Sequence, residues 1–366
     1  MNYFMPTRLF TGEHCIAKNV DVLRGLGSSC LIITEKGAAE ASGALADLKE
    51  ALDSASITSQ VFFGVRENPP LAIVAEAGRM AADLNVDFVV GLGGGSSQDA
   101  AKAAAVFASN PTLDEDAFYG FKWEVAPKPI VLVGTTSGTG SEVTKVSVLT
   151  DSKARKHSIH DDRLYATVSF GDPRHTHTCP KVTTLSCGVD ILAHAVEAYF
   201  SRKADEISRA FSVRAVRLAF APLAAAAAGE ALDADQRRDL YEASILGGLA
   251  INTCGTCFPH NVGYYLTENY HVPHGYASAV FMPDMLELCR DQHPAYTQDF
   301  FDALGHTQQE LVKLVTDAIG DLAITMDTQE IEAALPRWEG NGSVKNTLAD
   351  VTTDDIRRIL TDHFVA

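Results

Sequence analysis

One segment of the chain, CGVDILAHAVEAYF at 187–200, combines an apolar helical pattern with three ionisable side chains. Asp190, His194 and Glu197 stand at i, i+4 and i+7, so on an α-helix they project from one narrow face. This stripe could face water while the apolar residues face a core. Alternatively, Asp190 and His194, one turn apart, are two ligands of a metal ion. The segment alone leaves both interpretations open.

A second segment, PHNVGYYLTENYHVPHG at 259–275, supplies further imidazoles. His260, His271 and His274 lie in a predicted helix-to-loop stretch. Three histidines and one aspartate form a nitrogen and oxygen donor set that suits Fe(II), Zn(II) or Mn(II). The histidine pair of HTHTC at 175–179 competes with this set. Its i, i+2 spacing in a linker predicts a solvent-exposed loop instead.

Two glycine- and hydroxyl-rich turns could hold a nucleotide. In FVVGLGGGSSQDAAKAA (88–104), a strand leads through three glycines into a helix, where free N–H groups favour a pyrophosphate. Asp99, in the predicted first turn of that helix, could accept bonds from a ribose or amide. In VGTTSGTGSEVTKVSVLTD (133–151), small polar residues end another strand. Either turn alone could be an ordinary loop, and neither is the G-x-G-x-x-G fingerprint, but together they favour a nucleotide at one sheet edge.

The elements that must position these residues differ between the two halves of the chain. Before Pro180, strands alternate with helices, which predicts a parallel sheet covered on both faces. After it, helical patterns dominate. We therefore predict α/β plus all-α architecture: a Rossmann-like dinucleotide-binding domain at 1–180 and a helical metal-binding domain at 181–366. The predicted strands are 30–34, 60–63, 87–93 and 130–136, and the main predicted helices are 38–55, 70–84, 97–108, 182–200, 205–228, 235–251, 308–323 and 353–364.

Composition narrows the functional classes. The 366 residues carry a formal net charge of −17, which disfavours nucleic acid or an anionic membrane as the main partner. We find no apolar run long enough for a transmembrane helix and no secretion signal. Seven cysteines, an odd number, suit a reducing cytoplasm. The CGTC motif at 254–257 has redox spacing but lacks a strand-to-helix context, so we interpret its cysteines as packing residues.

The motifs GGGSSQDAAK, TTSGTGSEVT, GVDILAHAVEAY and HVPHG, in this order, resemble the iron-containing (group III) alcohol dehydrogenases. The resemblance runs from about residue 4 to about residue 290. It implies a metal held by Asp190, His194, His260 and His274. It also implies a set of cofactor-binding residues: Glu35, Asn68, Gly94, Gly95, Ser96, Asp99, Thr135, Thr136, Thr139, Thr144 and Lys156.

Two positions depart from the family pattern. Many members have Asp where Glu35 stands; an acid after this strand can bind a ribose diol and repels a 2′-phosphate, which favours NAD over NADP. Many also have a second His where this chain has Tyr264, and the surrounding motifs look most like the 4-hydroxybutyrate dehydrogenase branch. Proton transfer could therefore run through the ribose, His271 or Tyr264. Glu197 is left over, either beside the metal ligands or solvated.

The resemblance implies reversible hydride transfer between a small primary alcohol and nicotinamide, with Fe(II) as Lewis acid and Zn(II) as the alternative. The substrate is expected in a cleft between the domains, where such pockets tend to occur, and the protein is expected to be a homo-oligomer, dimer or larger. Two alternatives remain. One is a zinc-dependent polyol (glycerol-type) dehydrogenase or a sugar-phosphate cyclase of the same superfamily, and the other is a non-catalytic NAD-binding or metal-sensing module.

Overall fold

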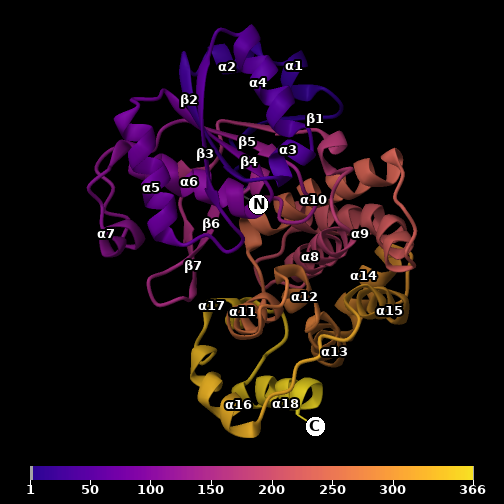
Figure 1. Ribbon diagram of the computed structural model, residues 1–366. Coiled ribbons are helices and arrows are strands. Elements are labelled where there is room, and N and C mark those ends of the chain that lie inside the picture. The colour runs from indigo at the N-terminus through magenta and orange to yellow at the C-terminus, as the bar shows by residue number, and fades with distance from the viewer. Residues whose placement is uncertain (1–2, 366) are drawn as a thin grey trace. The chain divides into compact units, whose positions relative to one another are not determined.

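The computed structural model describes residues 3–365 and divides into two compact units (Figure 1). The sheet unit runs from Phe4 to Pro180. The helical unit begins at Lys181 and also includes Tyr3.

The sheet unit is built on six parallel strands in the order β1-β8-β5-β4-β2-β3. All five neighbouring pairs run parallel, as expected where helices connect successive strands. The α/β class predicted for this half is therefore confirmed. The strands are β1 (Arg8–Thr11), β2 (Ser29–Glu35), β3 (Thr58–Val65), β4 (Phe88–Gly93), β5 (Ile130–Gly134) and β8 (Val168–Gly171).

Helices cover both faces of this sheet. Because side chains alternate along a strand, Leu31 and Ile33 of β2 pack with α5 and α6, whereas Cys30 and Ile32 face α1, α2 and α4. Burial on both sides explains why these strands are almost continuously apolar. The helices of this unit are α1 (Cys15–Lys18), α2 (Asp21–Arg24), α3 (Ala38–Ala41), α4 (Ala44–Ser54), α5 (Leu71–Asp83), α6 (Gly95–Ser109) and α7 (Glu115–Tyr119).

Two parts of the sheet unit differ from the prediction. The helix expected over 38–55 is split into α3 and α4 at Gly43, whose φ of 79° is left-handed. A separate antiparallel hairpin, β6 (Val146–Thr150) and β7 (Lys156–His160), was not predicted. It follows the hydroxyl-rich turn and is tied to α6 by hydrogen bonds in both directions: Ser147 and Val148 donate to Asp99, and the carbonyl of Val146 accepts from Lys102.

The helical unit packs eleven α-helices of the described residues around one core. Asp205 and Asp233 accept hydrogen bonds from the first turns of α9 and α10, which explains where these helices begin. By length and composition alone α9 could cross a membrane, but Ala219 and Leu223 pack in this core. The helices are α8 (Lys181–Tyr199), α9 (Glu206–Ala227), α10 (Ala234–Cys254), α11 (Phe258–Tyr270), α12 (His274–Ala279), α13 (Met282–Gln292), α14 (Pro294–Leu304), α15 (Gln308–Ile319), α16 (Thr328–Ala334), α17 (Gly342–Asn346) and α18 (Thr353–Phe364).

Candidate functional site

The polar stripe of α8 lies in the interior. Asp190, His194 and Glu197 are exposed by only 3%, 5% and 0%, so the water-facing interpretation of this stripe is wrong. An α-helix that is buried on nearly every side has no solvent face to explain its ionisable groups. These groups must therefore be satisfied by one another, by neighbouring elements or by a ligand.

Two further helices bring imidazoles to this stripe. His260 lies in the first turn of α11, and His274 is the first residue of α12, directly after Pro273. The Oδ1 atom of Asp190 lies 3.5 Å from Nε2 of His260 and 3.9 Å from Nε2 of both His194 and His274. Two atoms bound to a tetrahedral ion at ~2.1 Å lie ~3.4 Å apart, which the separations from Asp190 approach. The ligand atoms of Asp190, His260 and His274 all lie within 4.8 Å of one another, whereas His194 lies outside that group although it is 3.9 Å from Asp190.

Two atoms at the centre of this cluster are unsatisfied. Among the described residues, Oδ1 of Asp190 and Nε2 of His260 are buried and have no hydrogen-bond partner. Buried polar atoms in folded proteins are nearly always paired, so a ligand is expected between them. The ion pairs of Asp190 in the described part of the chain involve histidines alone. A buried carboxylate with three imidazoles fits a divalent transition metal.

The charges in this cluster shift its proton affinities. Burial alone would raise the pKa of Asp190, but the neighbouring histidines hold it well below its usual value. Burial alone would lower the pKa of His260, but the charge of Glu197 and interactions with Asp190 and Glu197 raise it to about 10. The cluster therefore attracts positive charge strongly.

Two glycines bring the ligand-bearing helices into backbone contact. A Cβ on Gly275 would lie 1.8 Å from the carbonyl oxygen of Ser186 in α8. A Cβ on Gly263 of α11 would lie 2.4 Å from the carbonyl oxygen of Ala277 in α12. No other residue fits at either position without moving a helix. The protein backbone therefore fixes where the four side chains stand.

The two residues predicted to relay protons are placed differently. The ring of Tyr264 is half-buried and stacks on that of His274, with centroids 5.6 Å apart and planes inclined by 28°. His271 is exposed and ends α11 in a left-handed conformation, with φ of 56°. Tyr264 therefore lies against a predicted metal ligand, whereas His271 is the C-cap residue of α11.

The two predicted nucleotide turns meet at the carboxyl ends of the neighbouring strands β4 and β5. The N–H of Thr135 donates to the carbonyl oxygen of Gly93 over 3.1 Å. A Cβ on Gly94 would lie 3.0 Å from Oγ1 of Thr136, and one on Gly95 would lie 2.6 Å from Cγ2 of Thr139. Because α6 begins at Gly95, its free N–H groups open at this edge, which is where open α/β sheets bind ligands.

Asp99 supports this edge of the sheet through hydrogen bonds to the hydroxyl-rich turn and to the hairpin that follows it. It lies just past the first turn of α6, and its carboxylate accepts bonds from Oγ of Ser141 (2.7 Å) and N–H of Val148 (2.9 Å). Lys102, which no sequence motif marks as functional by itself, is fully buried and donates to Ser141 (2.6 Å) and to the carbonyl of Val146 (2.8 Å). It ends the family motif GGGSSQDAAK. Asp99 and Lys102 together hold the hydroxyl-rich turn and hairpin against α6.

The other predicted cofactor residues are spread around the same unit. Glu35 ends β2, next to β4, and its side chain is largely exposed; the partial burial of its carboxylate and then the charge of Glu67 raise its pKa. Asn68 follows β3 with φ of 52°, and its carbonyl accepts a bond from Thr150. The remaining three are Ser96 in the first turn of α6, Thr144 after the hydroxyl-rich turn, and Lys156 at the start of β7.

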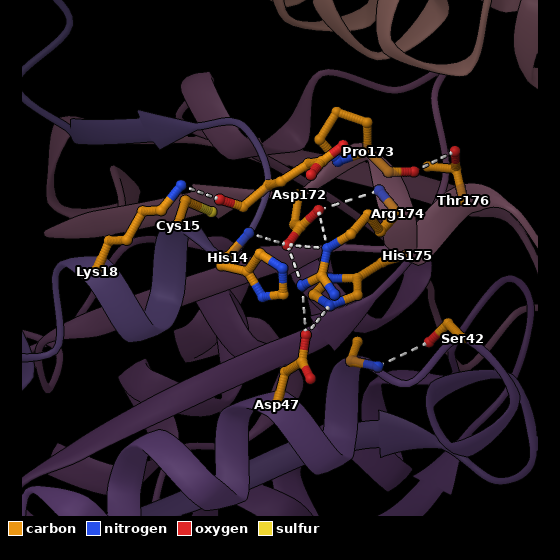
Figure 2. A network of polar contacts seen from close by, with 12 residues as sticks. His14, Cys15, Lys18, Ser42, Asp47, Asp172, Pro173, Arg174, His175 and Thr176 are labelled. Carbon is orange, nitrogen blue, oxygen red and sulfur yellow. Dashed lines mark hydrogen bonds and ion pairs between the residues drawn. The ribbon is translucent and has the colours of Figure 1, made fainter. Parts of the chain in front are cut away.

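A second polar cluster lies in the sheet unit (Figure 2). His175 is buried at 2% exposure, so the solvent loop predicted for it is wrong, while His177 is exposed as expected. The chain after β8 turns back onto α4, where Nε2 of His175 lies 3.0 Å from Oδ2 of Asp47. Arg174 pairs with Asp47 at 2.7 Å and with Asp172 at 2.5 Å. Asp47, Asp172 and His175 could form a metal site by spacing, but the guanidinium already supplies the cation.

The cysteines of CGTC are packing residues, as predicted. Sγ of Cys254 donates to the carbonyl of Ala250 over 2.8 Å, and Sγ of Cys257 to that of Glu197 over 3.4 Å. Burial raises the pKa of Cys254 to about 11 and that of Cys257 well above its usual value. Thiols this reluctant to ionise do not suit disulfide exchange.

A parallel-sheet unit with two polar turns at neighbouring strand ends and a helical unit with a buried carboxylate–histidine cluster fit the class of metal-dependent dehydrogenases. The sequence agrees with this class. Residues 6–173 match the family model for iron-containing alcohol dehydrogenase, and residues 184–335 match the C-terminal model of the Fe-containing alcohol dehydrogenase family. The chain belongs to the iron-containing alcohol dehydrogenase family and is an oxidoreductase that acts on alcohols.

Individual relatives span the whole chain. A long-chain-alcohol dehydrogenase of Geobacillus thermodenitrificans is 34% identical over 96% of this chain and 89% of its own length. The structure of an iron-containing alcohol dehydrogenase from Thermotoga maritima superposes with a TM-score of 0.90 at 32% identity, covering 99% of both chains. Sulfoacetaldehyde reductase from Bifidobacterium kashiwanohense, solved with NAD+, gives 0.87 at 27% identity, covering 99% of this chain and 98% of its own.

Proposed function

We propose that this chain is an iron-dependent, NAD(H)-linked dehydrogenase that interconverts a small primary alcohol and its aldehyde. The metal ligands are Asp190, His194, His260 and His274. The observation that supports this most directly is the pair of unsatisfied buried atoms, Oδ1 of Asp190 and Nε2 of His260, which face each other at 3.5 Å.

A divalent ion held there would act as a Lewis acid that lowers the pKa of the alcohol and favours loss of its hydride to nicotinamide. The side chains of the protein would orient the alcohol and move its proton. Tyr264, stacked on His274, is the side chain nearest this centre among the two relay candidates, and its hydroxyl is suited to pass the alcohol proton outward. His271, exposed at the end of α11, is the more distant candidate.

The nucleotide is proposed to lie along the carboxyl ends of β2, β4 and β5. The start of α6 at Gly94 and Gly95 would hold the pyrophosphate, because free N–H groups and the helix dipole favour anions. Glu35 would accept bonds from the ribose hydroxyls and repel a 2′-phosphate, so NAD is preferred over NADP. The relative solved with NAD+ supports the same cofactor.

The substrate is proposed to be a short ω-hydroxy acid such as 4-hydroxybutyrate, acted on in the cytoplasm by a homo-oligomer. Tyr264 and its flanking motifs support that branch of the family. By their names, one relative acts on alcohols with a long alkyl chain and another on an aldehyde that carries a sulfonate. The family therefore permits a substrate with an anionic tail.

The test is a screen of C2 to C6 aldehydes, with and without a terminal carboxylate, against NADH and NADPH at 340 nm. Protein is purified without oxygen, and its metal content is measured by mass spectrometry. We expect one iron per chain, NADH preferred, and succinic semialdehyde among the best substrates. A preference for glycerol with bound zinc would replace this proposal by a polyol dehydrogenase. No turnover with any aldehyde, although NADH binds, would indicate a non-catalytic module.

A further inference from the structure

Glu197 is the one ionisable side chain of the α8 stripe without a role so far. It is fully buried, with 0% of its surface exposed. An ionised carboxylate is costly to bury unless its oxygens accept hydrogen bonds. Both oxygens of Glu197 do: Oε1 lies 2.5 Å from Nδ1 of His260, and Oε2 accepts the backbone N–H of Cys257 over 2.6 Å.

These two bonds select one form of the His260 ring. A carboxylate can only accept, so Nδ1 of His260 must carry the proton that lies between them. If a metal ion displaced the second ring proton, the available lone pair would be on Nε2, which is the nitrogen that lies 3.5 Å from Oδ1 of Asp190. Glu197 thus leaves free the nitrogen that belongs to the predicted ligand set.

The same carboxylate also fixes the element that carries this ring. Cys257 is the N-cap of α11 and has no side-chain capping bond of its own. Oε2 of Glu197 takes its N–H, and Sγ of Cys257 donates to the carbonyl of Glu197 over 3.4 Å. Three hydrogen bonds therefore join one turn of α8 to the start of α11, and His260 stands in that first turn.

The charges agree with this arrangement. Among the ion pairs of the described residues, those of Glu197 and Asp190 involve histidines alone. Two buried negative charges on either side of one imidazole match the two positive charges of a divalent ion. Carboxylates that hold a ligand histidine in this way raise the basicity of the ligand and orient its ring.

We propose that Glu197 is a positioning residue that orients His260 and selects its metal-binding tautomer. The role rests on the proposed ligand set, since it requires that His260 binds the ion. A purely structural role, in which Glu197 only anchors α11, would change stability and leave metal affinity unaltered.

The decisive variant is Glu197→Gln. Its amide has the same shape but keeps only one acceptor oxygen, with an NH2 donor in place of the other. It can therefore accept the Nδ1–H of His260 or the N–H of Cys257, but not both. Metal-free protein is titrated with Co(II) against a chromophoric chelator, and the d–d absorption of the bound ion and the thermal midpoint of the metal-free protein are recorded. We expect affinity to fall by roughly ten- to a hundredfold with an altered absorption envelope, the range seen when such partners are removed.

The matched control is Glu268→Gln, in α11 like His260, whose side chain is 8% exposed and pairs with Arg337. It should alter stability and leave Co(II) affinity at the wild-type value. If Glu197→Gln does not fold, Glu197→Asp carries the test, because it keeps the charge but shortens the reach to His260. We expect about tenfold weaker binding for this variant.

The outcomes separate the two proposals. Wild-type affinity in folded Glu197→Gln or Glu197→Asp would overturn the role of Glu197 and leave the ligand set standing. Failure of the wild-type protein to bind Co(II), or wild-type binding by Asp190→Asn, would overturn the ligand set itself and this role with it.

Discussion

Two clusters in this molecule have nearly the same composition and spacing. Each holds three ligand-type atoms within 4.8 Å of one another. They are Asp190, His260 and His274 in the helical unit, and Asp47, Asp172 and His175 in the sheet unit. The second cluster contains its own cation, because Arg174 bonds both carboxylates (Figure 2). The first has no lysine or arginine among the ion pairs of the described residues. Its unsatisfied buried atoms include a carboxylate oxygen, Oδ1 of Asp190, whereas in the second cluster the unsatisfied buried atom is a ring nitrogen, Nδ1 of His175.

The difference shows that spacing alone does not distinguish a metal site from a salt-bridge network. Both clusters would pass a search for nearby carboxylates and imidazoles. The two clusters differ in the balance of charge. Arg174 balances the carboxylates of the second cluster, whereas the carboxylate of the first has no lysine or arginine beside it among the described residues and therefore attracts a cation from outside the chain. The two clusters can therefore be tested against each other with matched substitutions.

The largest difference is expected between Asp190→Asn and Asp47→Asn. Loss of the central carboxylate should remove the metal and lower kcat/KM by at least about a thousandfold, since metal assistance is worth several kcal/mol at about 1.4 kcal/mol per tenfold. Asp47→Asn should keep both metal content and activity near the wild type. Steady-state kinetics and metal analysis check this. Equal loss in both variants would break the contrast between the clusters.

Metal removal should affect one cluster alone. Chelation is expected to lower the free energy of unfolding by about 2.7 kcal/mol when the ion had been present at about a hundred times its Kd. The effect should vanish in Asp190→Asn and persist in Asp47→Asn. Calorimetry with and without chelator measures it. A chelator effect that survives in Asp190→Asn would place the ion elsewhere.

Removal of the internal cation should destabilise the sheet unit. In Arg174→Met, Asp172 at 1% side-chain exposure loses its charged partner. Breaking a buried pair costs about 3–5 kcal/mol, and partial exposure of Arg174 and Asp47 reduces our expectation to about 2 kcal/mol. Urea denaturation checks this value, with Co(II) affinity at the helical unit as the control that should not change. Full stability in Arg174→Met would mean that this network contributes little.

The smallest expected effect is on acid stability. Burial would raise the pKa of Asp47, but hydrogen bonds from His175 and Arg174 and their charges hold it below the usual value. A lowered pKa means that the contribution is present above the unfolded value of about 3.9 and is lost as pH falls below it. Because Asp47 is one-third exposed, we expect less than about 1 kcal/mol between pH 5 and 3. Urea curves of Asp47→Asn should show a shallower decline than the wild type, and identical declines would contradict this.

The sequence predicted most of the architecture because its signals are local. Apolar runs such as those of β2 and β4 and the helical periods of α8 to α10 are set by residues near one another. Contacts between segments far apart in the sequence were harder to predict. The i, i+2 histidines after β8 indicated a loop, since nothing local shows that the chain returns to α4, and Glu197 stayed undecided because its partners, Cys257 and His260, lie about sixty residues further along.

The metal set itself was predicted by resemblance to a family. Helical spacing shows that Asp190 and His194 share a face, but it does not show which of the later histidines reaches them. The structure brings His260 and His274 to Asp190 and leaves His271 exposed. That choice depends on where α11 ends and α12 begins, a boundary that propensity locates only to within a few residues.

The backbone contacts at Gly263 and Gly275 have a consequence for how the proposed metal ion is bound and exchanged. Helices packed this closely would hold the proposed ligand histidines in place before an ion binds, so binding of the proposed ion would demand little further ordering of the chain. Such an ion could then be exchanged without unfolding the protein. Which metal occupies the site would follow from the supply in its surroundings as much as from the protein, because affinity alone discriminates poorly among divalent ions.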